Sequence, residues 1–104
     1  MLPQNRKATH PGQILLQEYL APLGLTQKSL ADHLGVPTQR INELVRGKRG
    51  VTPDTAWLLA QAFETTPEFW LNLQINHDLS ALEPRRTVAK LKSATPDGQK
   101  AKSA

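Results

Sequence analysis

The sequence predicts an all-α fold: five helices in one domain at residues 10–82, a flexible arm at 1–9 and a basic, partly disordered tail at 83–104. Two observations support this fold class. Apolar residues recur three or four positions apart, which places them on one face of a helix. The triplets Thr-Pro-Asp at 52–54 and Thr-Pro-Glu at 66–68 are helix starts, because threonine caps, proline suits the first position and a carboxylate favours the first turn.

The first helix is expected to run from Pro11 to about residue 20 or 23, with His10 as a candidate cap and Gly24 just past its end. Its apolar residues include three in succession, so they form a wide band rather than a narrow stripe. The band is expected to pack on the helices that follow, and the alternative is that part of it contacts a partner protein. Its members are Ile14, Leu15, Leu16, Tyr19, Leu20 and Leu23.

Residues 25–48 predict two helices joined by a tight turn. Thr26 is a suitable N-cap for the first of them, and Gly35 suits the left-handed position at its end. Pro37 stops that helix and favours a new start at Thr38. This spacing is typical of the DNA-binding helix-turn-helix. The expected buried residues are Leu30, Ala31, Leu34, Ile41, Leu44 and Val45.

The polar face of the second of these helices carries the side-chain types that match base edges in the major groove. An ordinary amphipathic helix with a solvated face is the plain alternative, and the preceding helix and turn favour DNA binding. The base-contacting candidates are Thr38, Gln39, Arg40, Asn42 and Glu43. The phosphate-contacting candidates are Gln27, Arg46, Lys48 and Arg49. Gln39 is the best single candidate, since an amide can pair with adenine N6 and N7.

Charge is distributed in keeping with this hypothesis. The net charge is +4 and the sequence pI about 9.8. Within residues 37–50 the cations are opposed only by Glu43, and within residues 84–104 only by Asp97, whereas the remainder is acidic. A basic domain is consistent with a polyanionic partner such as double-stranded DNA.

The last two helices are expected to start at Pro53 and Pro67. The first of the two has a core stripe, and the second is apolar over most of its circumference to about His77, with a possible extension to Leu82. Such a surface needs cover. We predict a homodimer interface there, and the alternative is that residues 78–92 fold back over the helix, with one or two turns at 87–92. The core stripe is Ala56, Leu59, Ala60 and Phe63, and the predicted interface residues are Phe69, Trp70, Leu73 and His77.

Several functional classes are not expected. The chain has no cysteine, and no serine stands at a suggestive spacing from a base and a third group, so no catalytic residue is predicted. His10, His33 and His77 form no i, i+4 pair, so no metal site is predicted, nor a cofactor or small-molecule ligand. Without a membrane span or the apolar core of a signal peptide, we expect a cytoplasmic protein.

Three motifs together resemble the HigA antitoxin family, also called the virulence-associated protein I group, with a phage-repressor-like (lambda-repressor-like, XRE-type) helix-turn-helix. They are His10-Pro11-Gly12, Gly47-Lys48-Arg49 with Thr52-Pro53, and above all TPEFWLNLQINHDL at 66–79. The resemblance covers about residues 10–82. The sequence departs from the family pattern at Ser29, where glutamate is frequent, so no capping box with Thr26 is expected.

The resemblance implies an antitoxin that binds a HigB-like toxin, an mRNA endonuclease, and represses its own operon as a dimer on a palindromic operator. Dimerisation also follows from size, because one recognition helix reads too few base pairs for specificity, and two such helices about 34 Å apart solve this. The alternatives are a stand-alone regulator without a toxin and a protein-interaction module whose DNA surface has decayed. No role for the tail is implied.

Overall fold

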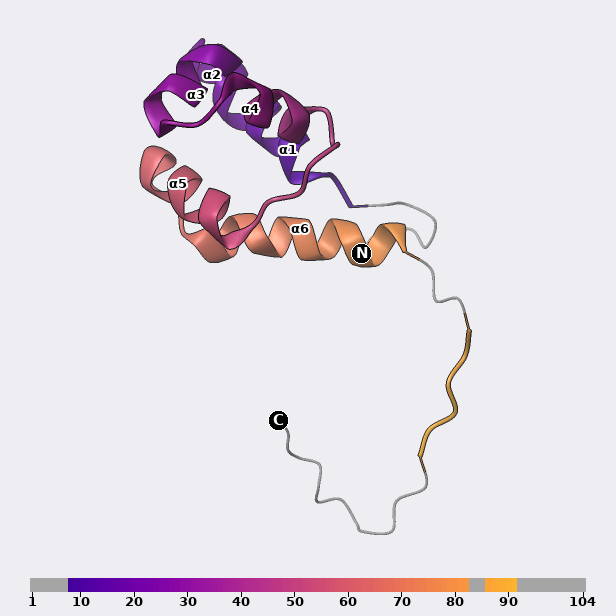
Figure 1. Ribbon diagram of the computed structural model, residues 1–104. Coiled ribbons are helices and arrows are strands. Elements are labelled where there is room, and N and C mark those ends of the chain that lie inside the picture. The colour runs from indigo at the N-terminus through magenta and orange to yellow at the C-terminus, as the bar shows by residue number, and fades with distance from the viewer. Residues whose placement is uncertain (1–7, 83–85, 92–104) are drawn as a thin grey trace.

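A computed structural model describes residues 8–82 and 86–91 of the chain. α1, η1 and α2 form one continuous first helix, so these residues contain five helices and no strand, which confirms the predicted fold class (Figure 1). The elements are α1 (Pro11–Ile14), the π-helical η1 (Leu15–Leu20), α2 (Ala21–Leu23), α3 (Gln27–Leu34), α4 (Thr38–Val45), α5 (Pro53–Phe63) and α6 (Pro67–Ala81).

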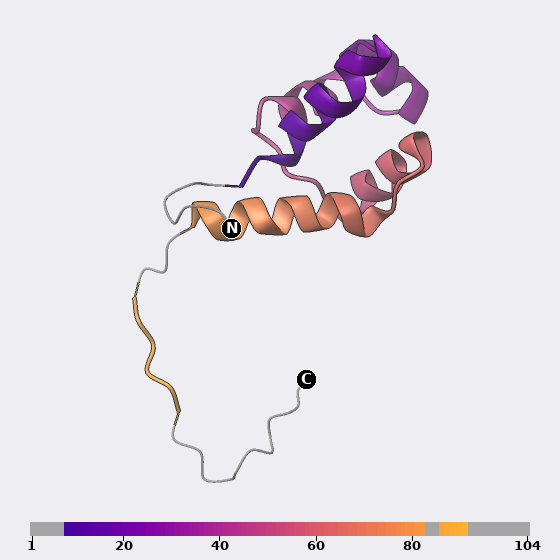
Figure 2. The same cartoon turned by 180° about the vertical axis from the view of Figure 1, so that it is seen from behind.

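The long helix α6 lies along one side of the domain, and α5 packs on its N-terminal half (Figures 1 and 2). α3 packs on α4, and the first helix contacts both α4 and α6. The start signals act as expected: the hydroxyl oxygens of Thr52 and Thr66 accept the backbone N–H of Thr55 and Phe69, and proline follows each cap. These caps satisfy amides that the first turn of a helix leaves without a partner.

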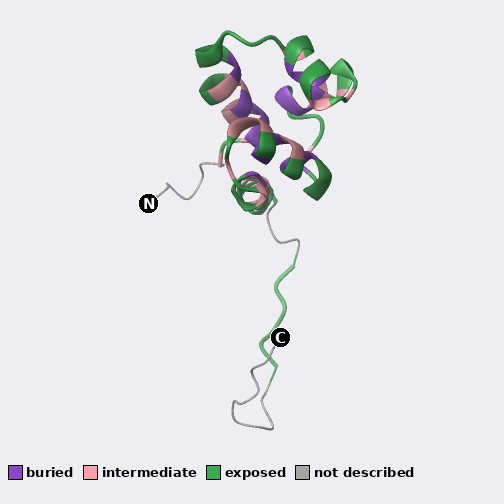
Figure 3. Ribbon diagram, turned by 90° about the vertical axis from the view of Figure 1, so that its left-hand side faces the viewer, coloured by how far each residue is buried: buried purple, intermediate pink, exposed green. Residues whose placement is uncertain are grey.

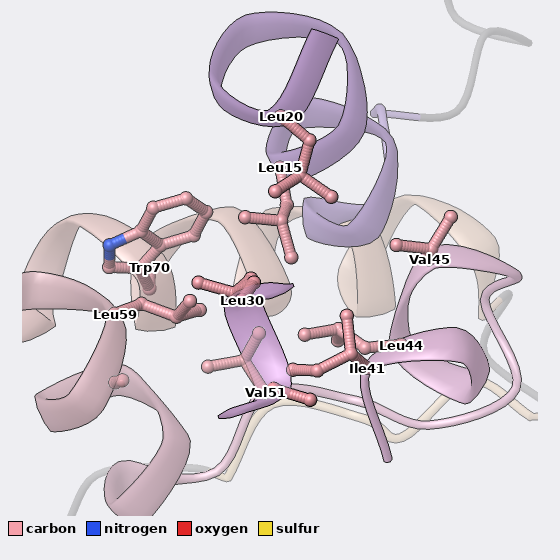
Figure 4. Packing of buried hydrophobic residues seen from close by; sticks show 11 residues of the cluster. Leu15, Leu20, Leu30, Ile41, Leu44, Val45, Val51, Leu59 and Trp70 are labelled. Atoms are coloured by element: carbon pink, nitrogen blue, oxygen red, sulfur yellow. The ribbon is translucent and has the colours of Figure 1, made fainter. Parts of the chain in front are cut away.

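Buried side chains from every helix meet in one core (Figure 4). Eight of the ten residues expected to be buried in the helix-turn-helix and in the helix that follows it are buried, and Leu34 and Phe63 are partly buried against the same cluster. Trp70 is the largest fully buried side chain. Its indole N–H donates to Thr65 Oγ1 at 2.7 Å, and its ring lies 5.3 Å from that of Tyr19. The buried apolar residues of the cluster are Leu15, Leu20, Leu30, Ala31, Ile41, Leu44, Val45, Val51, Ala56, Leu59 and Trp70.

Gly12 allows the first helix to approach α4 closely. A Cβ at this position would lie 1.8 Å from the carbonyl oxygen of Leu44, which is far inside contact distance. Only glycine, therefore, fits where the two backbones meet. This packing sets the angle at which α4 is presented. The sequence analysis gave Gly12 no such role.

The described ends of the arm and tail differ in their contacts. His10 caps α1 as expected, since its Nδ1 accepts the backbone N–H of Gly12 at 2.9 Å. Ala8, assigned to the flexible arm, donates its backbone N–H to Ser80 Oγ at 2.8 Å and so lies on α6. Residues 86–91 are extended and exposed, so the expected turns at 87–92 are not formed there (Figure 3). The remaining arm and tail predictions fall on 1–7, 83–85 and 92–104, outside the described residues.

Candidate nucleic-acid interface

α3 and the turn that joins it to α4 form as the sequence predicted, with one correction at the start of α3. Thr26 Oγ1 accepts the backbone N–H of Ser29 at 2.9 Å, and Ser29 Oγ accepts that of Thr26 at 3.0 Å. A capping box is therefore present, because a serine hydroxyl is long enough to reach back across one turn. Gly35 follows in the left-handed conformation (φ 76°), which a residue without Cβ adopts at no steric cost.

α4 divides into a buried and a polar face as predicted. Ile41, Leu44 and Val45 are buried. Thr38 and Gln39 in the first turn are exposed, whereas Arg40, Asn42 and Glu43 are half-buried, and each of these three has a protein partner. Thr38 and Gln39 are consequently the most accessible of the predicted base-contacting residues.

Glu43 joins a predicted base contact to a predicted phosphate contact. Gln39 Nε2 donates to Glu43 Oε2 at 3.0 Å, and Arg49 donates to Glu43 Oε1 through Nε at 3.1 Å and Nη2 at 2.9 Å. The hydrogen bonds from Arg49, and then from Gln39, hold the pKa of the Glu43 carboxyl below its ordinary value. Charged hydrogen bonds of this kind fix side-chain orientation. Glu43 therefore holds Gln39 and Arg49 in a fixed relation on the surface of α4.

Two further contacts link α4 to its neighbours. Asn42 Nδ2 donates to Gln27 Oε1 at 3.0 Å, which brings together a predicted base contact and a predicted phosphate contact across the two helices. Arg40 Nη1 lies 3.4 Å from Asp54 Oδ2, in the first turn of α5. Arg40 thus lies toward α5, and its guanidinium is not directed outward in the way that Gln39 is.

The loop after α4 presents the remaining cations. Arg46, Lys48 and Arg49 are exposed. The loop is tied to α6 by Gln74, whose Oε1 accepts the backbone N–H of Val51 at 2.7 Å. This role of Gln74 was not predicted from the sequence, although a polar side chain among the apolar residues of α6 was the available signal.

The comparisons with known proteins agree with this geometry. The family model described as helix-turn-helix matches residues 16–70. Virulence-associated protein I of Dichelobacter nodosus is 49% identical over 76 residues, which cover 73% of this chain and 70% of that protein. Antitoxin HigA-1 of Vibrio cholerae is 41% identical over 80 residues, covering 76% and 74%.

The chain belongs to the HigA and virulence-associated protein I family of helix-turn-helix proteins. A solved structure, antitoxin GraA in complex with its operator, matches with a TM-score of 0.78 and 36% identity, covering 89% of this chain and 100% of that one. The chain is accordingly a helix-turn-helix regulator of the HigA type. In residues 8–82 and 86–91, no helix has the length and apolar character needed to span a membrane.

Among the predicted interface residues on α6, Trp70 needs correction. Trp70 has no exposed surface and belongs to the core of the single chain, because its ring fills the space between η1 and α5. Leu73 is partly buried against the core. His77 does not end the helix, which continues to Ala81; its Nδ1 lies 2.9 Å from the carbonyl oxygen of Ala8. Phe69 retains 37% of its surface exposed.

A different stripe of α6 is left uncovered. Ile75 and Leu79 are 51% and 71% exposed and lie four residues apart on one helical face, and Leu82, just past the end of the helix, is 70% exposed. The sequence analysis recognised that this helix has surplus apolar surface. It could not tell which residues supply that surface, because a helix that is apolar all round has no periodic pattern to separate the two faces.

Proposed function

We propose that this protein binds its own operator as a homodimer and represses transcription, and that it is the antitoxin of a HigBA-type module. The observation that carries the proposal is the exposed polar face of α4, flanked by cations of the following loop, on a helix-turn-helix. The similarity to antitoxin GraA in complex with its operator and to antitoxin HigA-1 supports it.

In this account DNA contacts divide into two kinds. Thr38 and Gln39, in the first turn of α4, enter the major groove, where the Gln39 amide pairs with adenine. Glu43 holds Gln39 at 3.0 Å and so reduces the freedom that the amide loses on binding. Lys48, Arg46, Arg49 and Gln27 contact phosphates, which adds affinity without sequence preference.

The dimer is proposed on the exposed stripe of α6 rather than on Trp70. Ile75, Leu79 and Leu82 on two copies can form a self-complementary apolar contact across a two-fold axis. Phe69 remains a predicted contact, whereas Leu73 and His77 face the core and the segment before the first helix, on the other side of α6 from Ile75 and Leu79. Association would place two α4 helices about one DNA turn apart on a palindromic site.

A reporter assay tests the proposal in cells. The DNA upstream of the protein's own gene drives a reporter, and the chain is supplied with and without the neighbouring gene product. We expect repression by the wild type, none by Gln39→Ala, and rescue of growth when the neighbouring toxin is induced. Repression without rescue would establish a stand-alone regulator instead. No repression in any arm would favour the protein-interaction module.

A further inference from the structure

An apolar groove lies beside the helix-turn-helix, and Leu25 and Ser29 at the start of α3 belong to its lining. Three hollows that share Ala62 join to form it between the end of the first helix, α3 and the end of α5. Leu23 and Leu25, at 61% and 36% exposure, are its largest exposed apolar side chains, and Phe63 lines it from α5. Exposed leucines gathered around a hollow are typical of a binding site.

The position of the groove leaves α4 free. α5 begins beside α4, where Asp54 meets Arg40; it first lines the groove at Leu58 and reaches the Leu23 end of the groove at Phe63, nine residues after Asp54. At 1.5 Å per helical residue these points are about 14 Å apart. A molecule seated over Leu23 and Phe63 therefore does not need to cover the first turn of α4.

The negative charge of the groove disfavours binding of nucleic acid and favours binding of a cationic partner. Glu18 and Glu64 line it, and its described lining contains no lysine or arginine. A polyanion is repelled by this surface, whereas a basic protein is attracted to it.

The backbone conformation of Glu64 independently indicates a binding role for its carboxylate. It adopts φ 56°, and it is the one non-glycine residue with positive φ among those described. The other described helix ends in this conformation are glycines, at 24 and 35. A glutamate there carries a steric penalty that a glycine would avoid. The presence of glutamate at this position is explained if its carboxylate binds a cationic group at the rim of the groove.

We propose that this groove binds a basic partner protein, which places apolar side chains over Leu23 and Phe63 and cationic side chains against Glu18 and Glu64. The identity of the partner rests on the proposed function: an mRNA endonuclease needs a basic surface to hold its substrate, so within that function the partner is the toxin. DNA and the partner would then occupy opposite ends of α5.

The test uses the full chain in ¹⁵N NMR titrations with two synthetic 16-residue amphipathic peptides. Both carry the same leucine stripe, and one is flanked by lysines and the other by glutamates. We expect the lysine peptide to shift the amides of residues 23–25 and 62–64 and leave those of α4 unmoved. The glutamate peptide should bind at least about tenfold more weakly.

Two variants separate a binding role from a structural one. Glu64→Gly should weaken the lysine peptide several-fold while the melting temperature stays level or rises, because glycine fits φ 56° without strain. Glu68 is an exposed carboxylate outside the groove lining, so Glu68→Gln should change neither the affinity for the lysine peptide nor the melting temperature. Equal binding of both peptides, or a lower melting temperature for Glu64→Gly, would overturn the proposal.

Two other outcomes identify a different occupant or a different failure. If groove amides shift with protein concentration alone, a second copy of this chain occupies the groove and the proposal is wrong. If the lysine peptide binds as expected but growth rescue in cells fails, the groove stands and only the identification of the partner with a toxin is lost.

Discussion

Gln74 in α6 accepts the backbone N–H of Val51 at 2.7 Å, and so attaches the cationic loop after α4 to the helix on the far side of the core. The same side chain donates to Asp78 Oδ1 at 2.9 Å. Helix α6, which we propose as the dimer contact, is thereby connected to the residues proposed to meet phosphates. The position of Lys48 and Arg49 depends on a residue that is distant from DNA.

Replacing Gln74 tests this connection. Gln74→Ala leaves the Val51 amide, on a buried residue, without its acceptor, which costs about 1–3 kcal/mol of stability. We also expect weaker binding to any duplex, because the loop is no longer held in place, with the preferred sequence unchanged. Fluorescence anisotropy on specific and random duplexes measures this. Asn76→Ala, an exposed polar residue of the same helix, is the control, and equal losses in both variants would contradict the connection.

The contact between Gly12 and Leu44 predicts an unusually sensitive glycine. Gly12→Ala places a methyl group within 1.8 Å of a backbone carbonyl oxygen, so the first helix must shift away from α4. Overpacking of this kind costs about 1–3 kcal/mol, and more where backbone must move. Urea denaturation measures the loss, and Gln17→Ala on the exposed side of the same helix should be near neutral. A neutral Gly12→Ala would mean that the two helices are not in contact there.

Substitutions at Trp70 and Leu79 should distinguish a residue of the core from a residue of the dimer interface. Trp70→Ala removes the largest buried side chain and should cost about 3–5 kcal/mol of folding stability. Leu79→Asp, at a position 71% exposed, should keep the helical content and shift the protein to monomer in analytical ultracentrifugation. If Leu79→Asp stays dimeric, the stripe of Ile75, Leu79 and Leu82 is not the dimer contact.

His10 makes stability depend on pH in the weakly acidic range. Burial, and then the nearby His77, lower the pKa of His10 below its ordinary value of 6.5, against an opposing effect of Asp78. Its Nδ1 accepts the Gly12 N–H only when unprotonated. The unfolded chain therefore binds the proton more readily, and stability falls as pH drops below about 6.5. Unfolding free energies at pH 7.5 and 5.5 should differ less in His10→Asn, and an unchanged difference would assign the effect elsewhere.

The fold was largely predictable, because its helices start and stop on local signals. Thr52-Pro53, Thr66-Pro67 and Gly35 act within one turn of their own positions, so sequence alone places them. Tertiary choices were not predictable in this way. The sequence could not show whether Trp70 faces inward, because the helix is apolar over most of its circumference and only packing selects the face that is buried.

The residue types of the candidate site could be predicted from the sequence, but the contacts between their side chains could not. The polar face of α4 follows from helical periodicity. The pairing of Glu43 with Gln39 and Arg49, and that of Arg40 with Asp54, depends on where a loop and a second helix return in space. Ser29 was misjudged for a different reason: a family preference for glutamate concealed that a hydroxyl makes the same cap.

In the proposed complex, Gln39 distinguishes one DNA sequence from another, while Lys48 adds affinity for any duplex. The most direct test is anisotropy of the full chain on its upstream DNA and on a random duplex, each at two salt concentrations. Gln39→Ala should lose about 1–3 kcal/mol on the upstream site alone, and Lys48→Ala should weaken both duplexes equally and reduce the salt slope by about one. An altered sequence preference in Lys48→Ala, or binding that does not respond to salt, would rule out this division between Gln39 and Lys48.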